Sequence, residues 1–148
     1  MRVVIQRVSS ASVSIEGKVK ADINKGLLIL LGITEGDTLE NIQWLCKKIA
    51  NLRIFGDEEG KMNKSVIDIK GEMIVVSQFT LYGNAKKGNR PSYIRAAKPD
   101  IAIPLYKRFL SELRYMSGLK VESGEFGAYM EVSLVNDGPV TIIIDSEN

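Results

Sequence analysis

The sequence predicts an α+β fold, because strand-like segments at both ends of the chain flank two helix-like segments separated by a further strand. Apolar residues alternate with polar ones through Arg2–Val8 and Ser12–Glu16, which is typical of half-buried strands. Between Leu39 and Leu52 the apolar residues instead recur at helical spacing. Strand-rich blocks around helices favour a sheet with mostly antiparallel contacts.

The N-terminal third predicts four strand-like segments followed by the first helix. Glu16-Gly17-Lys18 is a candidate hairpin turn, from which the chain returns through Val19–Ile23. Gly26–Ile33 is a continuous apolar run, as expected for a buried central strand. Asp37 and Glu40 match a capping box with Asp37 as the N-cap, so we expect the helix to start there.

The remainder predicts a strand, a basic loop, a second helix and a return to strands. Glu72–Phe79 is strongly strand-like, and Asn84–Lys98 forms a long loop. Pro104 lacks a backbone N–H, so we expect the second helix to start there after a looser turn from Asp100. The last strands are expected at Lys120–Glu122, Ala128–Val135 and Val140–Asp145.

Length and composition indicate one globular domain over residues 1–148, with 45% hydrophobic and 26% charged residues. No targeting signature precedes the first strand, and the longest apolar run, Leu27–Leu31, is far shorter than the roughly 20 residues of a membrane span. The one cysteine, Cys46, excludes an internal disulfide and lies on the helical stripe, so we interpret it as a core residue. A reducing compartment, the cytoplasm, is expected.

The chain contains no histidine, which excludes a Ser-His-Asp triad and a Cys-His dyad. A zinc site would need carboxylates and the single thiol, so we expect neither a metal nor another cofactor. Any chemistry must therefore use backbone dipoles, hydroxyls, lysines, carboxylates or the substrate itself.

Charge is distributed unevenly although the net charge is only +2. Nine basic and two acidic residues lie between Asn84 and Lys120, whereas residues 121–148 hold six acidic residues and no basic one. This asymmetry is compatible with a positive face for a phosphate backbone, and equally with a solvated charged surface.

Two motifs are more specific than these patterns. Asn136-Asp137-Gly138-Pro139-Val140-Thr141 lies between two apolar strand-like runs, and Ser77-Gln78-Phe79-Thr80-Leu81-Tyr82-Gly83 follows a strand. Either motif alone would suggest no more than a β-turn or a strand end.

Together with Met1–Val8 the two motifs resemble the D-aminoacyl-tRNA deacylase family over essentially the whole chain. That family hydrolyses the ester between a D-amino acid and tRNA, without a cofactor. The resemblance implies a barrel-like sheet with two helices and a homodimer whose active site lies at the subunit interface.

The resemblance implies that residues 77–80 line the pocket for the aminoacylated 3′ adenosine. The backbone N–H groups of Phe79 and Thr80 are then oxyanion donors, while Ser77 and Gln78 contact the amino acid or the ribose. Thr80 would be a nucleophile only with an adjacent base. The alternative is substrate-assisted hydrolysis, in which the 2′-hydroxyl of the adenosine positions or activates water.

In the resembled family the Gly138-Pro139 peptide is cis and enters the partner subunit's active site. There it excludes L side chains by steric clash, which predicts broad tolerance of D side chains and hydrolysis of glycyl-tRNA. Arg7 is expected to support this loop through its carbonyl groups, although a plain surface arginine is the alternative.

Two further segments match. Lys87–Tyr93 resembles the family's basic loop, so Lys86, Lys87 and Arg90 are expected to contact tRNA phosphates. Gly124–Met130 resembles part of the adenosine pocket. There Phe126 is expected to stack on the base, Ala128 to leave room and Met130 to line the wall, with core packing as the alternative for Phe126.

Two other functions remain open: an editing module that removes a wrong L-amino acid, against which the Gly-Pro motif argues, and a non-catalytic protein that binds RNA ends or nucleotides.

Overall fold

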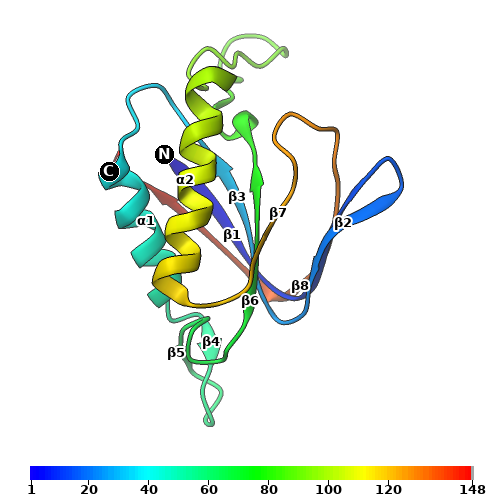
Figure 1. Cartoon of the computed structure of the whole chain (residues 1–148), viewed down its shortest axis with the longest axis vertical. Helices are drawn as coiled ribbons and strands as arrows, with labels where there is room; N and C mark the ends of the chain where they lie inside the picture. The colour runs from blue at the N-terminus through cyan, green and yellow to red at the C-terminus, as the bar shows by residue number, and fades with distance from the viewer. Residues whose placement is uncertain (148) are drawn as a thin grey trace.

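The computed structural model describes residues 1–147, which form a mixed sheet that curls toward a barrel and carries both long helices on one face (Figure 1). The strands follow the order β2-β1-β3-β6-β7, and β8 pairs with β1 beside this path. The elements are β1 (Arg2–Ile15), β2 (Lys18–Ile23), β3 (Gly26–Gly32), α1 (Leu39–Asn51), β4 (Phe55–Gly56), β5 (Met62–Lys64), β6 (Glu72–Ser77), η1 (Phe79–Tyr82), α2 (Pro99–Ser117), β7 (Val121–Ser123) and β8 (Glu131–Asp145).

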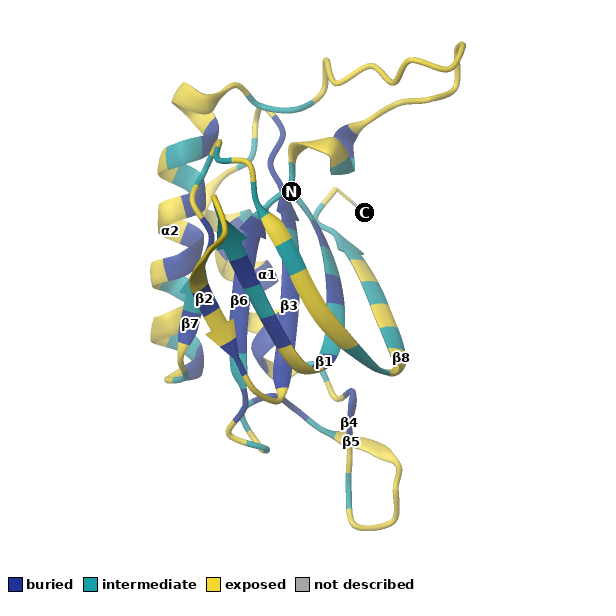
Figure 2. Cartoon of the chain, turned by 90° about the vertical axis from the view of Figure 1, so that its right-hand side faces the viewer, coloured by how far each residue is buried: buried dark blue, intermediate teal, exposed yellow. Residues whose placement is uncertain are grey.

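Strand β1 curls the sheet because it is long enough to pair with different neighbours along its length. Residues 2–8 pair with β3, residues 11–15 pair with β2, and β8 runs antiparallel to both halves. Glu16 and Gly17 both have positive φ, as the tight turn from β1 into β2 requires. Because β1 pairs with both β2 and β3, β2 is turned over the sheet (Figure 2). The expected barrel-like architecture is therefore confirmed.

All three pairings of β1 are antiparallel, whereas β3–β6 and β6–β7 are parallel. Antiparallel pairing thus predominates in the main sheet, as expected from the order of the elements. Parallel neighbours need a crossover, and helices α1 and α2 occupy the two crossovers. Within residues 1–147, neither helix is long and apolar enough to cross a membrane.

The larger hydrophobic core lies between the helices and the sheet. Cys46 is fully buried there, and its thiol lies 3.6 Å from the carbonyl oxygen of Phe109, as the helical stripe predicts. Burial, together with the nearby carboxylate of Glu112, raises the pKa of this thiol to about 12. Cys46 is therefore a packing residue.

A smaller core fills the inside of the curled sheet, on the face away from the helices. Its buried members are Val8, Ala11, Val13, Ala21, Ile23, Leu28, Ile74 and Val76. Alternate residues of β3 and β6 thus point into different cores, because successive side chains of a strand face opposite ways. The continuous apolar run of β3 is explained by burial on both faces.

Helix α1 is capped one residue later than the sequence predicts. Thr38 is the N-cap: its hydroxyl accepts from the amide of Asn41, whose side-chain oxygen accepts from the amide of Thr38 at 2.8 Å. Asp37 instead accepts from the N-terminal ammonium group of Met1 at 2.6 Å. The predicted box of Asp37 and Glu40 was wrong because the Asp37 carboxylate serves this long-range ion pair.

Helix α2 begins at Pro99, five residues before the predicted start. Pro99 occupies a first-turn position, where its missing N–H costs nothing. The amide of Ala102 already donates to Lys98 at 2.8 Å. Pro104 lies inside the helix but on its exposed side, so water can satisfy the carbonyl group left without a helical donor.

Candidate active site

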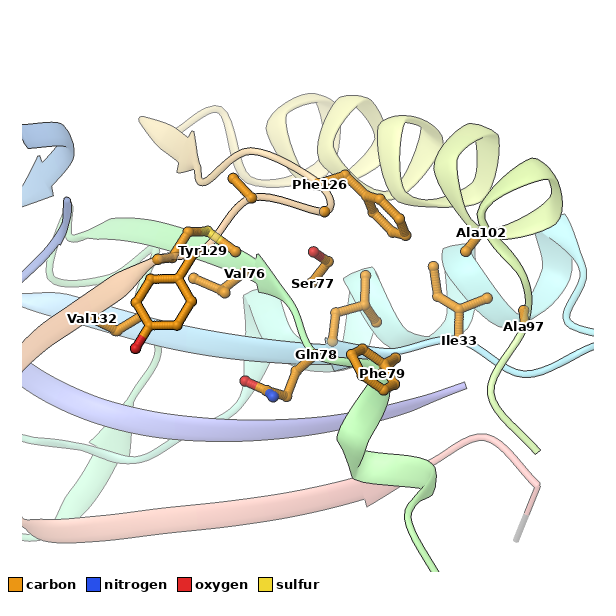
Figure 3. Close-up of a pocket in the computed structure, with 14 residues that line it drawn as sticks. Ile33, Val76, Ser77, Gln78, Phe79, Ala97, Ala102, Phe126, Tyr129 and Val132 are labelled. Atoms are coloured by element: carbon orange, nitrogen blue, oxygen red, sulfur yellow. The ribbon is translucent and has the colours of Figure 1, made fainter. Parts of the chain in front are cut away.

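A pocket of about 280 Å³ opens at the carboxyl ends of the parallel strands β3 and β6, where the two cores meet (Figure 3). Its wall combines these strand ends with η1, the start of α2 and the segment before β8. Six of the residues predicted to form the site line it: Ser77, Gln78, Phe79, Phe126, Ala128 and Met130. The structure therefore brings together two segments that lie some fifty residues apart in the sequence.

Strand β6 ends at Ser77, and the chain turns at once into the short helix η1. The amide of Gln78 still donates to the carbonyl oxygen of Leu31 at 2.8 Å, which fixes the turn against β3. A Cβ at Gly32 would lie 3.0 Å from that of Leu81, so the glycine lets η1 pack closely on β3. The amides of Phe79 and Thr80 stand in the first turn of η1, where a helix offers its N–H groups no internal acceptor.

Thr80 lies beside the pocket rather than in its wall. Its side chain is exposed, and its hydroxyl group accepts from the side-chain amide of Gln78. An amide cannot take a proton from a hydroxyl, so this contact does not activate Thr80 as a nucleophile. Moreover, no residue lining the pocket is an aspartate, glutamate, lysine or arginine. The pocket wall thus supplies apolar surface, hydroxyl groups and amides, but no carboxylate or amine base.

The opposite wall is built by residues 124–130. A Cβ at Gly124 would collide with the sulfur of Met130, so this glycine lets the methionine side chain approach the backbone closely. The ring of Phe126 packs 5.9 Å from that of Tyr106, whose hydroxyl donates to Val75 at 2.7 Å. Phe126 packs against the core, which was the alternative for this residue, and its ring also faces the pocket (Figure 3).

Gly138 and Pro139 lie in a bulge of β8 rather than in a hairpin turn. Val8 pairs with Asn136 and Gln6 with Thr141, so three more residues separate the partners on β8 than on β1. Both apolar runs consequently belong to one strand along β1, and the β-turn alternative is wrong. The peptide between Gly138 and Pro139 is cis.

Arg7 holds this bulge in place. Its Nε donates to the carbonyl oxygen of Asp137 at 3.0 Å, and its Nη1 donates to that of Ile54 at 2.7 Å. A Cβ at Gly138 would lie 2.8 Å from Nη2 of Arg7, and φ at Gly138 is +127°, a conformation that favours glycine. The expected contact to the loop carbonyls is present, so Arg7 is not a plain surface arginine.

The bulge and the pocket are separate in the single chain. Neither Gly138 nor Pro139 lines the pocket, and both are exposed on β8, whose outer edge has no strand partner within residues 1–147 (Figure 2). The structure thus does not bring this pair of predicted site residues together with the other six within one subunit.

The basic loop projects from the pocket end of the molecule (Figure 2). Asn84 and Ser92 exchange two backbone hydrogen bonds of 2.8 and 2.9 Å, which close the loop around the exposed Lys86, Lys87 and Arg90. At its base the ring of Tyr93 packs edge-on against Phe79, with centroids 5.2 Å apart. The three cations therefore flank the pocket without lining it.

The sequence did not single out several lining residues, including Ile33, Ala97 and Ala102. Ala97 and Ala102 lie before and within the first turn of α2, which crosses the end of β3 only in the folded chain. No local signal marks them. Tyr129 and Val132 also line the pocket, and they lie within or beside the segment Gly124–Met130 that the sequence did indicate.

The model of the family "D-Tyr-tRNA(Tyr) deacylase" matches residues 4–145. A D-aminoacyl-tRNA deacylase of Bacteroides fragilis is 62% identical over all 148 residues and 99% of its own length. One of Flavobacterium psychrophilum is 65% identical, with the same coverage. A solved structure described as "c-Myc DNA Unwinding Element Binding Protein" superimposes with a TM-score of 0.92, at 43% identity over 98% of both chains. A second, a "probable eukaryotic D-amino acid tRNA deacylase", has a TM-score of 0.82 at 18% identity over 97% of both chains, which shows the shared fold alone.

The fold and these matches define the class of protein as a hydrolase with the deacylase architecture. The chain belongs to the D-Tyr-tRNA(Tyr) deacylase family, and the family resemblance read from its motifs is confirmed.

Proposed function

We propose that this chain hydrolyses the ester of D-aminoacyl-tRNA, holding the 3′ adenosine and the amino acid in the pocket between Phe79 and Phe126. The observation that carries the proposal is the composition of the pocket. Apolar walls suit an adenine ring, the amides at the start of η1 suit a developing oxyanion, and the wall contains no carboxylate or amine base. Such a site suits a substrate that supplies its own reactive hydroxyl group.

In the proposed reaction, water attacks the ester carbonyl carbon and the bond to the ribose oxygen breaks. The amides of Phe79 and Thr80 donate to the carbonyl oxygen as it gains negative charge, and one such donor is typically worth on the order of 10²–10³ in rate. The neighbouring 2′-hydroxyl of the ribose orients the water and relays its proton to the departing 3′-oxygen. Ser77 and Gln78 hold the amino acid and the ribose in the geometry that the attack needs.

The chiral filter in this proposal comes from a second subunit. Gly138 and Pro139 do not line the pocket of their own chain. They can therefore act as the filter only in the pocket of another copy of the chain. Large apolar side chains remain exposed for such an association: Val135 is 57% exposed and Ile143 68% on β8, and Phe79 is 56% exposed at the pocket mouth. The proposed active unit is therefore a homodimer with two sites at its interface.

A backbone wall discriminates by exclusion rather than by gripping a side chain. Such a filter rejects the L side chain, accepts D side chains of different size and charge, and does not exclude glycine. Lys86, Lys87 and Arg90 contact the phosphates beyond the adenosine in this proposal, as salt-dependent positioning contacts. The proposed role is proofreading of charged tRNA in the cytoplasm.

The proposal is tested by single-turnover hydrolysis of tRNA esters of D-tyrosine, D-phenylalanine, D-aspartate, glycine and L-phenylalanine, with a chelator present. We expect the first four to be cleaved at rates within about tenfold of one another, since one tenfold step is only about 1.4 kcal/mol. Cleavage of the L-ester alone would indicate an editing module for L-amino acids. Tight tRNA binding without any turnover would indicate a non-catalytic binding protein and would contradict the proposed function.

A further inference from the structure

A second, open groove of about 570 Å³ lies along the carboxyl end of α1, outside the proposed active site. It is lined by Trp44, Lys47, Lys48, Asn51, Leu52 and Arg53. Figure 1 shows this end of α1 beside the β4–β5 hairpin. The groove combines one large aromatic ring with three cationic side chains.

Trp44 does not belong to the hydrophobic core beneath α1. The buried face of this helix is formed by Ile42, Leu45, Cys46, Ile49 and Ala50, whereas Trp44 is 44% exposed. It is the only tryptophan in the chain. The ammonium group of Lys48 lies 5.7 Å from the centre of the indole ring, so a cation already borders this aromatic face.

The charged residues that line the groove are all cationic. Residues 41–56 contain no aspartate or glutamate. In the adjacent hairpin, Asp57 accepts from the side-chain amide of Asn63 at 2.9 Å, and Glu58 pairs with Lys64 at 2.9 Å. The Glu58 carboxylate thus already has a cationic partner within the hairpin, and that of Asp57 is bound by amides of the same hairpin. Arg53 is held at the edge of the groove by its own bond to Asn63 at 2.7 Å.

The loop that leaves α1, next to the groove, is tied to the Gly-Pro bulge. Arg53 immediately precedes Ile54, and one guanidinium group, that of Arg7, binds the carbonyl oxygens of both Ile54 and Asp137. A subunit that inserts Gly138-Pro139 into a neighbouring pocket would carry with it the loop that leaves α1, which Arg7 ties to the bulge.

We propose that this groove binds the unpaired nucleotides next to the 3′ end of the tRNA whose terminal adenosine occupies the partner subunit's pocket. Trp44 stacks on one of their bases, and Lys47, Lys48 and Arg53 contact their phosphates. An aromatic ring flanked by cations is the arrangement that holds single-stranded RNA with little regard to sequence. The inference rests on the proposed function, because the bulge carries the loop beside the groove toward a site in trans. It assigns to the RNA a second basic contact, in addition to the loop of Lys86, Lys87 and Arg90.

The test compares two esters, D-tyrosyl-tRNA and the small ester D-tyrosyl-adenosine, which is too short to reach the groove. The variants are Trp44→Leu and the double variant Lys47→Gln/Lys48→Gln. The matched control is Lys18→Gln/Lys20→Gln, which removes the same charge from the exposed β2 hairpin. For the groove variants we expect the Kd for uncharged tRNA to rise on the order of tenfold, and the double variant to lower the slope of log K against log salt by about two. Hydrolysis of D-tyrosyl-adenosine should be unchanged.

The single tryptophan gives a direct readout in the wild-type protein. Stacking of a base on Trp44 should quench its fluorescence in proportion to the fraction of tRNA bound, and D-tyrosyl-adenosine should not. Three results would overturn the proposed binding of tRNA in the groove. They are an unchanged tRNA affinity in both variants, unchanged fluorescence on saturation with tRNA, or an equal loss of hydrolysis rate on both esters. If the wild type cleaves neither ester, the proposed function itself has failed, which is a separate result.

Discussion

Arg7 and Asp137, 130 positions apart in the sequence, are joined by a 3.0 Å hydrogen bond from the guanidinium group to the backbone carbonyl. The same side chain reaches the carbonyl oxygen of Ile54. Through these two bonds the first strand fixes the bulge of the last strand against the loop that leaves α1. The shape of the Gly-Pro element is therefore set by a side chain outside its motif.

Substitution of Arg7 tests this support. Arg7→Lys cannot reach both carbonyl groups because an ammonium group lacks the planar fork of a guanidinium group. We expect the free energy of unfolding to fall by roughly 1–3 kcal/mol and the preference for D over L esters to weaken. Urea denaturation and paired hydrolysis rates measure the two effects. As a control, Arg108→Lys keeps the positive charge beside Glu112 on a side chain that is 53% exposed, and should change stability by less than about 0.5 kcal/mol.

Gly138→Ala tests the wall that excludes L side chains. The added Cβ would lie 2.8 Å from Nη2 of Arg7, at a φ of +127° that strains an alanine. We expect the bulge to shift and the ratio of D to L hydrolysis to fall by about tenfold or more, which corresponds to about 1.4 kcal/mol of lost discrimination. Gly17→Ala, in a β-turn with open space around it, serves as the control for glycine loss alone. An unchanged ratio in a folded Gly138→Ala protein would remove this glycine from the filter.

Thr80→Val separates the two roles open to this residue. The substitution deletes the hydroxyl group but keeps the backbone amide and the side-chain volume. If Thr80 acts through its amide, the rate on D-tyrosyl-tRNA should remain within roughly tenfold of the wild type. Loss of a covalent nucleophile would instead cost on the order of 10⁴ or more, and such a loss would contradict the account of a pocket without a side-chain base.

Asp145 provides a test of pH dependence. Burial acts to raise the pKa of its carboxyl group, but the amide of Glu147 and the guanidinium group of Arg2, 2.7 Å away, together hold it below its usual range. A depressed folded pKa gives stability that is present at neutral pH and is lost as the pH falls through that value. The difference in unfolding free energy between wild type and Asp145→Asn should therefore be constant from pH 8 to 6 and shrink below about pH 4. A constant difference down to pH 2.5 would contradict the assigned contacts.

Much of the fold could be predicted because local patterns and burial agree. The alternation in β1, the double-sided burial of β3 and the stripe that contains Cys46 all appear in the structure as expected. The errors arose where a distant partner decides the local outcome. Asp37 looks like a helix cap, but the N-terminal ammonium group of Met1 takes its carboxylate.

The candidate site, like the fold, could be predicted where local sequence decides the structure and not where a distant contact does. The motif at Ser77–Thr80 and the segment Gly124–Met130 both reach the pocket wall or its rim, because each is a contiguous piece of chain with its own turn chemistry. The alanines at the start of α2 could not be found, since their place depends on how that helix crosses β3. Nor does the turn chemistry of Gly138-Pro139 reveal a bulge, because only the shared pairing with β1 distinguishes it from a hairpin.

The most direct measurement is the rate of tyrosine release from D-tyrosyl-tRNA and L-tyrosyl-tRNA, side by side, with the purified chain. The account predicts rapid hydrolysis of the D-ester, and loss of the L-ester no faster than in buffer alone. Equal hydrolysis of both esters would contradict the chiral filter assigned to Gly138 and Pro139, and hydrolysis of neither would contradict the assignment of the pocket as an esterase site.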